Sequence, residues 1–67
     1  MQYRYFELID DLGQDYYRID DSGEVETWSQ CDEMWYYGDI SSLDELYAIN
    51  ESTWTRSFQE VTEDDVR

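Results

Sequence analysis

Carboxylates dominate the reactive side chains of this 67-residue sequence. Eighteen aspartate and glutamate residues stand against four arginines, with no histidine and one cysteine, and the formal charge is −14. Catalysis by paired carboxylates requires two such groups held in a cleft with separated pKa values. A chain this short can hardly enclose such a cleft, and most of its acidic residues fall in turns. We therefore expect a protein that is not an enzyme and needs no cofactor.

Aspartate-rich turns also raise the question of calcium. An EF-hand loop needs acidic or amide residues at positions one, three and five, followed by glycine. Aligning Gly13 with that glycine puts Leu8 first, and aligning Gly23 puts Arg18 first, so neither turn fits. One cysteine without any histidine cannot build a structural zinc site. The sequence therefore predicts no metal site.

Seven carboxylates gather around two turns. In consecutive hairpins alternate turns lie at opposite ends of a sheet, and Glu24 and Glu26 fall about 6.6–6.8 Å apart along one strand. Carboxylates on a rigid sheet can imitate a row of phosphates, to which a basic groove is attracted. We predict that the partner-binding carboxylates are Asp10, Asp11 and Asp15 at the first turn and Asp20, Asp21, Glu24 and Glu26 at the second.

Two tyrosine pairs suggest a second kind of contact. Neighbours in a strand point to opposite faces, so one member of Tyr16-Tyr17 and one of Tyr36-Tyr37 must lie away from a shared core. Either both faces of the sheet are partly covered, or one aromatic face with an acidic rim is a contact surface. On the second reading we add Tyr17 and Tyr37 to the predicted partner-binding residues.

Composition limits the class of protein further. Such a high negative charge would indicate disorder in a chain poor in aromatic residues, but three tryptophans, seven tyrosines and two phenylalanines favour a folded domain. No basic patch is available for phosphates, which argues against direct binding of nucleic acid. No apolar run could span a membrane, no signal peptide is evident, and the lone thiol fits a reducing compartment. We expect a cytoplasmic protein.

Strand patterns fill the first half of the chain. Runs rich in aromatic and β-branched residues alternate with turns that contain glycine, typical of a β-meander. Gly13 and Gly23 suit the positive φ that such turns require. The predicted strands are Gln2–Ile9, Asp15–Ile19, Glu24–Ser29 and Met34–Tyr37, separated by turns at Asp10–Gly13, Asp20–Gly23 and the polar segment Ser29–Glu33, and closed by Gly38-Asp39.

The second half begins with a helix. Ser42-Leu43-Asp44-Glu45 is a capping box that predicts a helix over Ser42–Ile49. Residues 53–61 fit either helical or strand spacing, and their strand propensity favours a fifth strand. Residues 62–65 either cap a final helical turn or fray.

These elements define an α+β fold. We predict one small acidic domain over residues 1–67, an antiparallel β-meander of four or five strands with one short helix, about 42–49, packed on it. The aromatic hairpin Val25–Tyr37 is expected to supply much of the core. The domain is expected to be a monomer or a homodimer.

The expected function is inhibition by binding. The chain resembles, in size and charge only, the small acidic inhibitors of phages and mobile elements, including anti-restriction and anti-CRISPR proteins; the resemblance assigns no residue roles. It implies a DNA mimic that occludes the basic surface of a nucleic-acid-binding partner. An assembly module that uses a tyrosine-rich sheet face and an immunity protein against a basic toxin are the alternatives.

Overall fold

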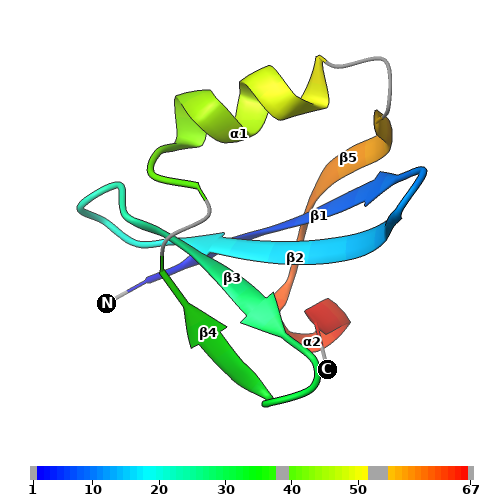
Figure 1. Cartoon of the computed structure of the whole chain (residues 1–67). Coiled ribbons are helices and arrows are strands. Elements are labelled where there is room, and N and C mark those ends of the chain that lie inside the picture. Colours follow the sequence, from blue (N-terminus) through cyan, green and yellow to red (C-terminus); the bar gives the residue numbers. More distant parts are fainter. Residues whose placement is uncertain (1, 38–39, 52–54, 67) are drawn as a thin grey trace.

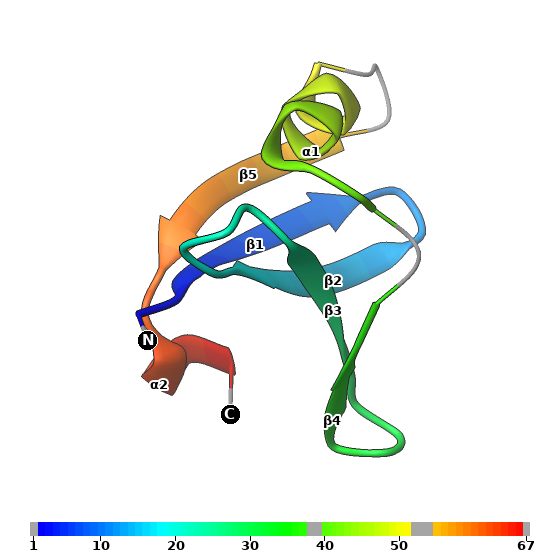
Figure 2. The ribbon, with the colours of Figure 1, turned by 90° about the vertical axis from the view of Figure 1, so that its left-hand side faces the viewer.

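One antiparallel sheet carries a helix on each of its faces (Figures 1 and 2). The computed structural model describes residues 2–37, 40–51 and 55–66. The strands lie in the order β4-β3-β2-β1-β5. This confirms the predicted α+β meander and adds a second, very short helix. The elements are β1 (Arg4–Asp10), β2 (Gly13–Ile19), β3 (Val25–Ser29), β4 (Met34–Tyr36), α1 (Leu43–Asn50), β5 (Thr55–Val61) and α2 (Glu63–Val66).

The β1–β2 hairpin is the longest paired unit of the sheet. Its register runs without interruption from Arg4↔Ile19 to Asp10↔Gly13. Asp10 closes the turn, because its Oδ1 accepts hydrogen bonds from the amides of Leu12 at 2.8 Å and Gly13 at 3.0 Å. Gly13 has a φ of +148°, which only glycine adopts readily. The first predicted turn is confirmed.

The β3–β4 hairpin is attached to the rest of the sheet over a short distance. β2 and β3 pair only from Tyr17↔Thr27 to Ile19↔Val25, and β3 and β4 pair at three further positions. In both ribbon views β3 and β4 turn away from β1 and β2 (Figures 1 and 2). The predicted hairpin around Cys31 is confirmed, whereas Gly38 and Asp39 lie outside the described residues.

Helix α1 begins where the capping box predicts. The Ser42 hydroxyl accepts a hydrogen bond from the Glu45 amide at 3.2 Å. The Glu45 carboxylate reaches back to Ser41, accepting from its amide at 3.0 Å and its hydroxyl at 2.7 Å, one residue earlier than in the standard box. The first bond satisfies an amide that the first helical turn leaves free, and the other two fix the chain just before the helix.

The last strand settles the ambiguity over residues 53–61. Thr55–Val61 forms β5, which pairs antiparallel with β1 and shifts register between Ile9 and Asp10. The predicted strand is therefore confirmed from Thr55 onward, while Thr53 and Trp54 lie outside the described residues. Helix α1 connects the β4 edge to the β5 edge across one face, and α2 lies beneath the other (Figure 1). Asp65 Oδ2 caps α2 by accepting from the Thr62 amide at 2.9 Å.

The main core lies between α1 and the sheet. It draws on strands β1, β2 and β3 and on α1, with Leu46 completely buried. The expectation that the aromatic hairpin supplies much of this core is wrong: Val25 is its one contribution among the described residues. Side chains alternate along β3, so Trp28, three residues after the buried Val25, lies on the opposite face together with its register partner Trp35, and both are half-buried. The core residues are Phe6, Leu8, Tyr17, Ile19, Val25, Ile40 and Leu46, with Leu43, Ile49 and Phe58 packed against them.

Candidate binding surface

The turn between β2 and β3 is held by one aspartate. Asp20 Oδ1 accepts hydrogen bonds from the Ser22 amide at 2.9 Å, the Ser22 hydroxyl at 2.6 Å and the Glu24 amide at 3.1 Å. The Gly23 amide donates to the Asp20 carbonyl at 3.1 Å, and Gly23 has a φ of +91°. The second predicted turn is thus confirmed. Its backbone is fixed by its own side chain, so the neighbouring carboxylates project from a rigid base.

These hydrogen bonds also set the charge of the turn. The Ser22 hydroxyl, followed by the backbone amides, holds the pKa of Asp20 below its ordinary value. Asp21 and Glu24 are exposed beside it. The turn therefore presents three carboxylates, of which Asp20 is committed to the fold and Asp21 and Glu24 face solvent.

A tyrosine from the far side of the β3–β4 hairpin joins this turn. The Tyr37 hydroxyl donates to Glu24 Oε2 at 3.2 Å, and the tyrosine is 65% exposed. Glu24 raises the pKa of Tyr37, first through this hydrogen bond and then through its charge. Both residues line a hollow of about 230 Å³, together with Val25, Ile40 and Ser41. A carboxylate, an exposed aromatic ring and an apolar recess are thus contiguous here.

Two of the predicted contact residues are not on a surface. Tyr17 is 6% exposed and belongs to the main core, so it cannot contact a partner in this fold. Glu26 is 9% exposed and forms a salt bridge with Arg18 at 3.0 Å between Nε and Oε1. Glu24 precedes β3 instead of lying in it, so Glu24 and Glu26 do not form a row along one strand. The expectation of such a row is wrong.

The first turn lies at the other end of the sheet, as expected for consecutive hairpins (Figure 1). Asp10 accepts hydrogen bonds from the backbone amides of this turn, and Asp11 forms a salt bridge with Arg56. In the turn itself Leu12 projects almost completely into solvent, and Asp15 at the start of β2 is exposed. The predicted carboxylates therefore fall into two separate groups, and only the β2–β3 turn is joined by a predicted tyrosine.

Positive charge on the described surface is largely neutralised within the chain. Each described arginine has an intramolecular carboxylate partner: Arg4 bonds Glu60 through two nitrogens, Arg18 bonds Glu26 and Arg56 bonds Asp11. Glu60 holds a raised pKa on Arg4, and Arg4 in turn lowers the pKa of Glu60. The carboxylates in excess of these pairs therefore give the surface its negative charge.

The face opposite α1 holds an aromatic cluster that the sequence reasoning did not single out as a site. Ring centroids lie 6.2 Å apart for Tyr3 and Tyr5, 5.9 Å for Tyr5 and Trp35, and 5.2 Å for Trp28 and Trp35. The Arg18 guanidinium lies over this cluster. Strand alternation places Tyr16 and Tyr17 on opposite faces of the sheet. The same alternation, applied to Trp28 and Trp35, would have predicted a second aromatic face.

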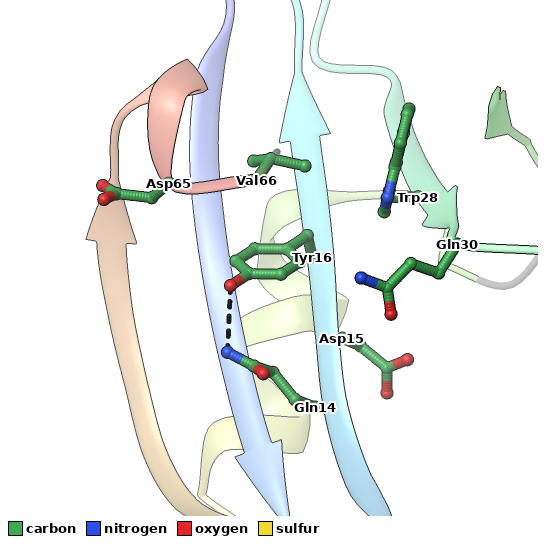
Figure 3. A pocket seen from close by; sticks show the side chains of 7 residues that line it. All are labelled: Gln14, Asp15, Tyr16, Trp28, Gln30, Asp65 and Val66. Carbon is green, nitrogen blue, oxygen red and sulfur yellow. Dashed lines mark hydrogen bonds between the residues drawn. The ribbon is translucent and has the colours of Figure 1, made fainter. Parts of the chain in front are cut away.

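Beside Trp28 the diverging strands leave a hollow of about 400 Å³ (Figure 3). Gln14, Asp15 and Tyr16 reach it from β2, Trp28 and Gln30 from β3 and its following loop, and Asp65 and Val66 from α2. The Tyr16 hydroxyl accepts from Gln14 Nε2 at 2.9 Å and donates to Glu7 at 3.1 Å. Desolvation, followed by that bond to Glu7, raises the pKa of Tyr16.

Three further features were sought among the described residues: a metal-binding cluster, a disulfide and a membrane-spanning helix. Among residues 2–37, 40–51 and 55–66, no group of three or more acidic or cysteine side chains is arranged to hold a metal ion. Cys31 is exposed in the β3–β4 loop, without a disulfide. None of the described helices has the length and apolar character needed to cross a bilayer.

Comparison of the chain with protein-family models, with curated proteins and with solved structures finds no match.

Proposed function

We propose that the chain is a non-enzymatic binding protein that occludes a basic surface on a partner protein. The observation that carries this proposal is the contact of Glu24 with Tyr37 beside the rigid Asp20–Glu24 turn. It joins exposed carboxylates, an exposed aromatic ring and an apolar recess in one patch. We name Asp21, Glu24, Tyr37 and that recess the turn surface.

The turn surface combines long-range and short-range attraction. Carboxylates on a chain with a formal charge of −14 steer a basic partner toward encounter and raise the association rate. Tyr37, with its large exposed ring, supplies contact area of the kind found at energetic centres of interfaces. A partner side chain of apolar character fills the recess beside Val25 and Ile40.

A nucleic-acid-binding protein is the proposed partner class. Its groove is shaped to receive phosphates and is lined with lysine and arginine. Asp21 and Glu24 would take the place of two phosphates, and the bound domain would prevent nucleic acid from entering. This is the mechanism of an anti-defence inhibitor of the kind made by phages. An immunity protein against a basic toxin would use the same surface, with a different partner.

Two variants of equal charge test the role of the turn surface. Asp21→Asn with Glu24→Gln removes both of its solvent-facing carboxylates, while Glu51→Gln with Asp64→Asn removes two exposed carboxylates elsewhere. A partner is first captured from host lysate and identified, and association rates are then measured over a salt series. The turn variant should associate more slowly and show a shallower salt dependence than the control variant. Asp20 is left unchanged because it holds the turn.

Competition identifies the partner's surface. Duplex DNA should compete with the domain for the captured protein, because both occupy one groove. Equal effects of the two variants would show that net charge, and no particular surface, governs binding. A partner that binds DNA and the domain simultaneously would contradict occlusion.

An assembly module is the second candidate, favoured by the β4 edge. Met34 and Tyr36 alternate with Trp35 on this three-residue edge strand and are 54% and 44% exposed. Pairing of two such edges would bury both side chains. Sedimentation at low and high salt separates the candidates: self-association that survives high salt and is lost in Tyr36→Ser favours assembly. For Tyr17, the core position rules out that role.

A further inference from the structure

The recess of the turn surface has an apolar part and a charged part. Val25 and Ile40, which line it, are 3% and 5% exposed and belong to the main core. Glu24, Tyr37 and Ser41 line it as well, and all three are exposed. In both ribbon views the β2–β3 turn lies beside the start of α1, so the recess joins segments distant in sequence (Figures 1 and 2). An occupant of the recess therefore needs an apolar body and a group that suits a carboxylate.

The charges around the recess select a cation. Glu24 raises the pKa of Tyr37 through its hydrogen bond and its charge, and the charges of two neighbouring carboxylates raise it further. The Ser41 amide and hydroxyl, which could otherwise bind an anion at the start of α1, both donate to Glu45. An anionic occupant is therefore repelled, and a cationic one is attracted.

The hydrogen bond between Tyr37 and Glu24 distinguishes lysine from arginine as the occupant. Glu24 Oε2 already accepts from the Tyr37 hydroxyl at 3.2 Å. A guanidinium binds a carboxylate best through two parallel hydrogen bonds, one to each oxygen, and that arrangement competes with the tyrosine. A lysine ammonium is a point charge that needs one oxygen, and its four-carbon stem can lie along apolar surface. The Ser41 hydroxyl oxygen, which lines the same recess, can accept a further hydrogen bond.

We propose that the recess of the turn surface receives a lysine side chain from the protein partner. The inference rests on the proposed function and names the residue type that the partner inserts. The lysine stem contacts Val25 and Ile40, and its ammonium pairs with the Glu24 carboxylate beside Tyr37. A wholly apolar side chain fits less well, because it would remove water from that carboxylate without replacing the lost hydrogen bonds.

The test uses N-acetyl-lysine methylamide as the probe, with the norleucine and arginine equivalents for comparison. Norleucine keeps the four-carbon stem but lacks the ammonium. Titrations of the full-length protein at constant ionic strength follow the methyl resonances of Val25 and Ile40. The lysine probe should shift them in a saturable manner, with a dissociation constant on the order of 10 mM, and arginine should bind about two- to fivefold more weakly.

Norleucine should produce no saturable shift at the same concentrations. Saturation by norleucine as complete as that by lysine would show that the recess recognises only apolar groups, and would overturn the proposal. Equal or tighter binding of arginine would overturn the assignment to lysine, and so would the absence of a saturable shift with the lysine probe.

Two variants with the same change of charge locate the carboxylate. Glu24→Gln keeps an acceptor for the Tyr37 hydroxyl but removes the charge, and should weaken lysine binding about two- to fivefold. Glu51→Gln removes an exposed carboxylate that does not line the recess, and should leave lysine binding unchanged. Equal weakening in both would reduce the effect to net charge and overturn the site.

Tyr37→Phe tests the discrimination between the two cations. It keeps the ring but removes the hydroxyl, so both oxygens of Glu24 become open to a guanidinium. The preference for lysine over arginine should therefore shrink or reverse. An unchanged preference would overturn the role given to the hydrogen bond between Tyr37 and Glu24 in selecting lysine.

These titrations need no partner, so their failure is distinct from failure of the proposed function, which is read from association rates with the captured protein. A lysine probe that does not bind, together with slower association of the Asp21 and Glu24 double variant, would remove the lysine site alone.

Discussion

Arg18 and Glu26 face each other as a register pair across β2 and β3, and their side chains meet at 3.0 Å on the sheet face opposite α1. The side chains are 21% and 11% exposed. The pair links the aromatic cluster to the hairpin that carries Trp28, because the same guanidinium lies over Tyr3 and Trp35. It is the described salt bridge from which water is most excluded.

The first prediction concerns this pair. Glu26→Gln should lower the free energy of unfolding by about 1–3 kcal/mol, because it leaves a partly buried guanidinium without its charged acceptor. Glu60→Gln removes the carboxylate from the half-exposed pair with Arg4 and should have a smaller effect. Urea unfolding of both variants measures the difference. Equal losses would show that burial does not strengthen the Arg18–Glu26 pair.

The second prediction compares two leucines at opposite extremes of burial. Leu46, on the inner face of α1, is fully buried, whereas Leu12 is 98% exposed at the β1–β2 turn. Leu46→Ala should cost about 2–5 kcal/mol, because it removes buried methyl groups and leaves a cavity. The same substitution at Leu12 should change stability by less than about 0.5 kcal/mol. A thermal or urea melt that ranks them in the reverse order would contradict the placement of the core.

The third prediction concerns the pH dependence of Asp20. Its pKa in the folded state is below the ordinary value of 3.8, chiefly because of the Ser22 hydroxyl. Its contribution to stability is therefore complete above pH 3.8 and is lost as the pH falls through the lower folded-state value. Ser22→Ala should raise the pKa of Asp20, as measured from the carboxyl ¹³C shift.

Ser41→Ala is the control for that titration. It removes the hydroxyl that donates to Glu45 and should raise the pKa of Glu45, which the Ser41 amide and hydroxyl hold low. Asp20 should not respond, because Ser41 does not bond it. An Asp20 pKa that is insensitive to Ser22 would assign its shift to the backbone amides instead.

The fourth prediction concerns the backbone of the β2–β3 turn. Gly23 has a φ of +91°, and no atom lies within 4 Å of the position that a Cβ would occupy. Gly23→Ala should therefore destabilise the fold by about 1–2 kcal/mol through backbone strain alone. It should also weaken partner binding if the turn surface makes the contact. A melt of the variant, together with its association rate, tests both effects.

The sequence predicts the local elements of this fold better than its faces. Gly13, Gly23 and the Ser42 cap each determine a turn or a helix start within a few residues, so those predictions are confirmed. Which face of the sheet α1 covers depends on contacts distant in sequence, and no local pattern reports that. Alternation puts Val25 and Trp28 on opposite faces, and α1 covers the face of Val25, so the core role expected of the aromatic hairpin was wrong.

More of the candidate surface could have been predicted from the sequence, beginning with the Arg18–Glu26 salt bridge. A turn that pairs Asp20 with Glu24 also sets Ile19 opposite Val25 and Arg18 opposite Glu26, so the salt bridge follows from the register of opposite charges. That step alone removes Glu26 from the candidate surface. The hollow beside Trp28 could not be predicted, because its lining brings Asp65 and Val66 of α2 together with residues of β2 and β3 that are distant in sequence.

The short pairing between β2 and β3 has a consequence for hydrogen exchange. Only three register pairs join the backbone of the β3–β4 hairpin to the longer β1–β2–β5 sheet. Its amides can therefore open and exchange as a separate cooperative unit, at a lower free energy than global unfolding. Such opening would part Tyr37 from Glu24 and separate the walls of the hollow beside Trp28. A partner that binds at the Tyr37–Glu24 contact or at this hollow would slow hydrogen exchange throughout the hairpin, including at amides that the partner does not contact.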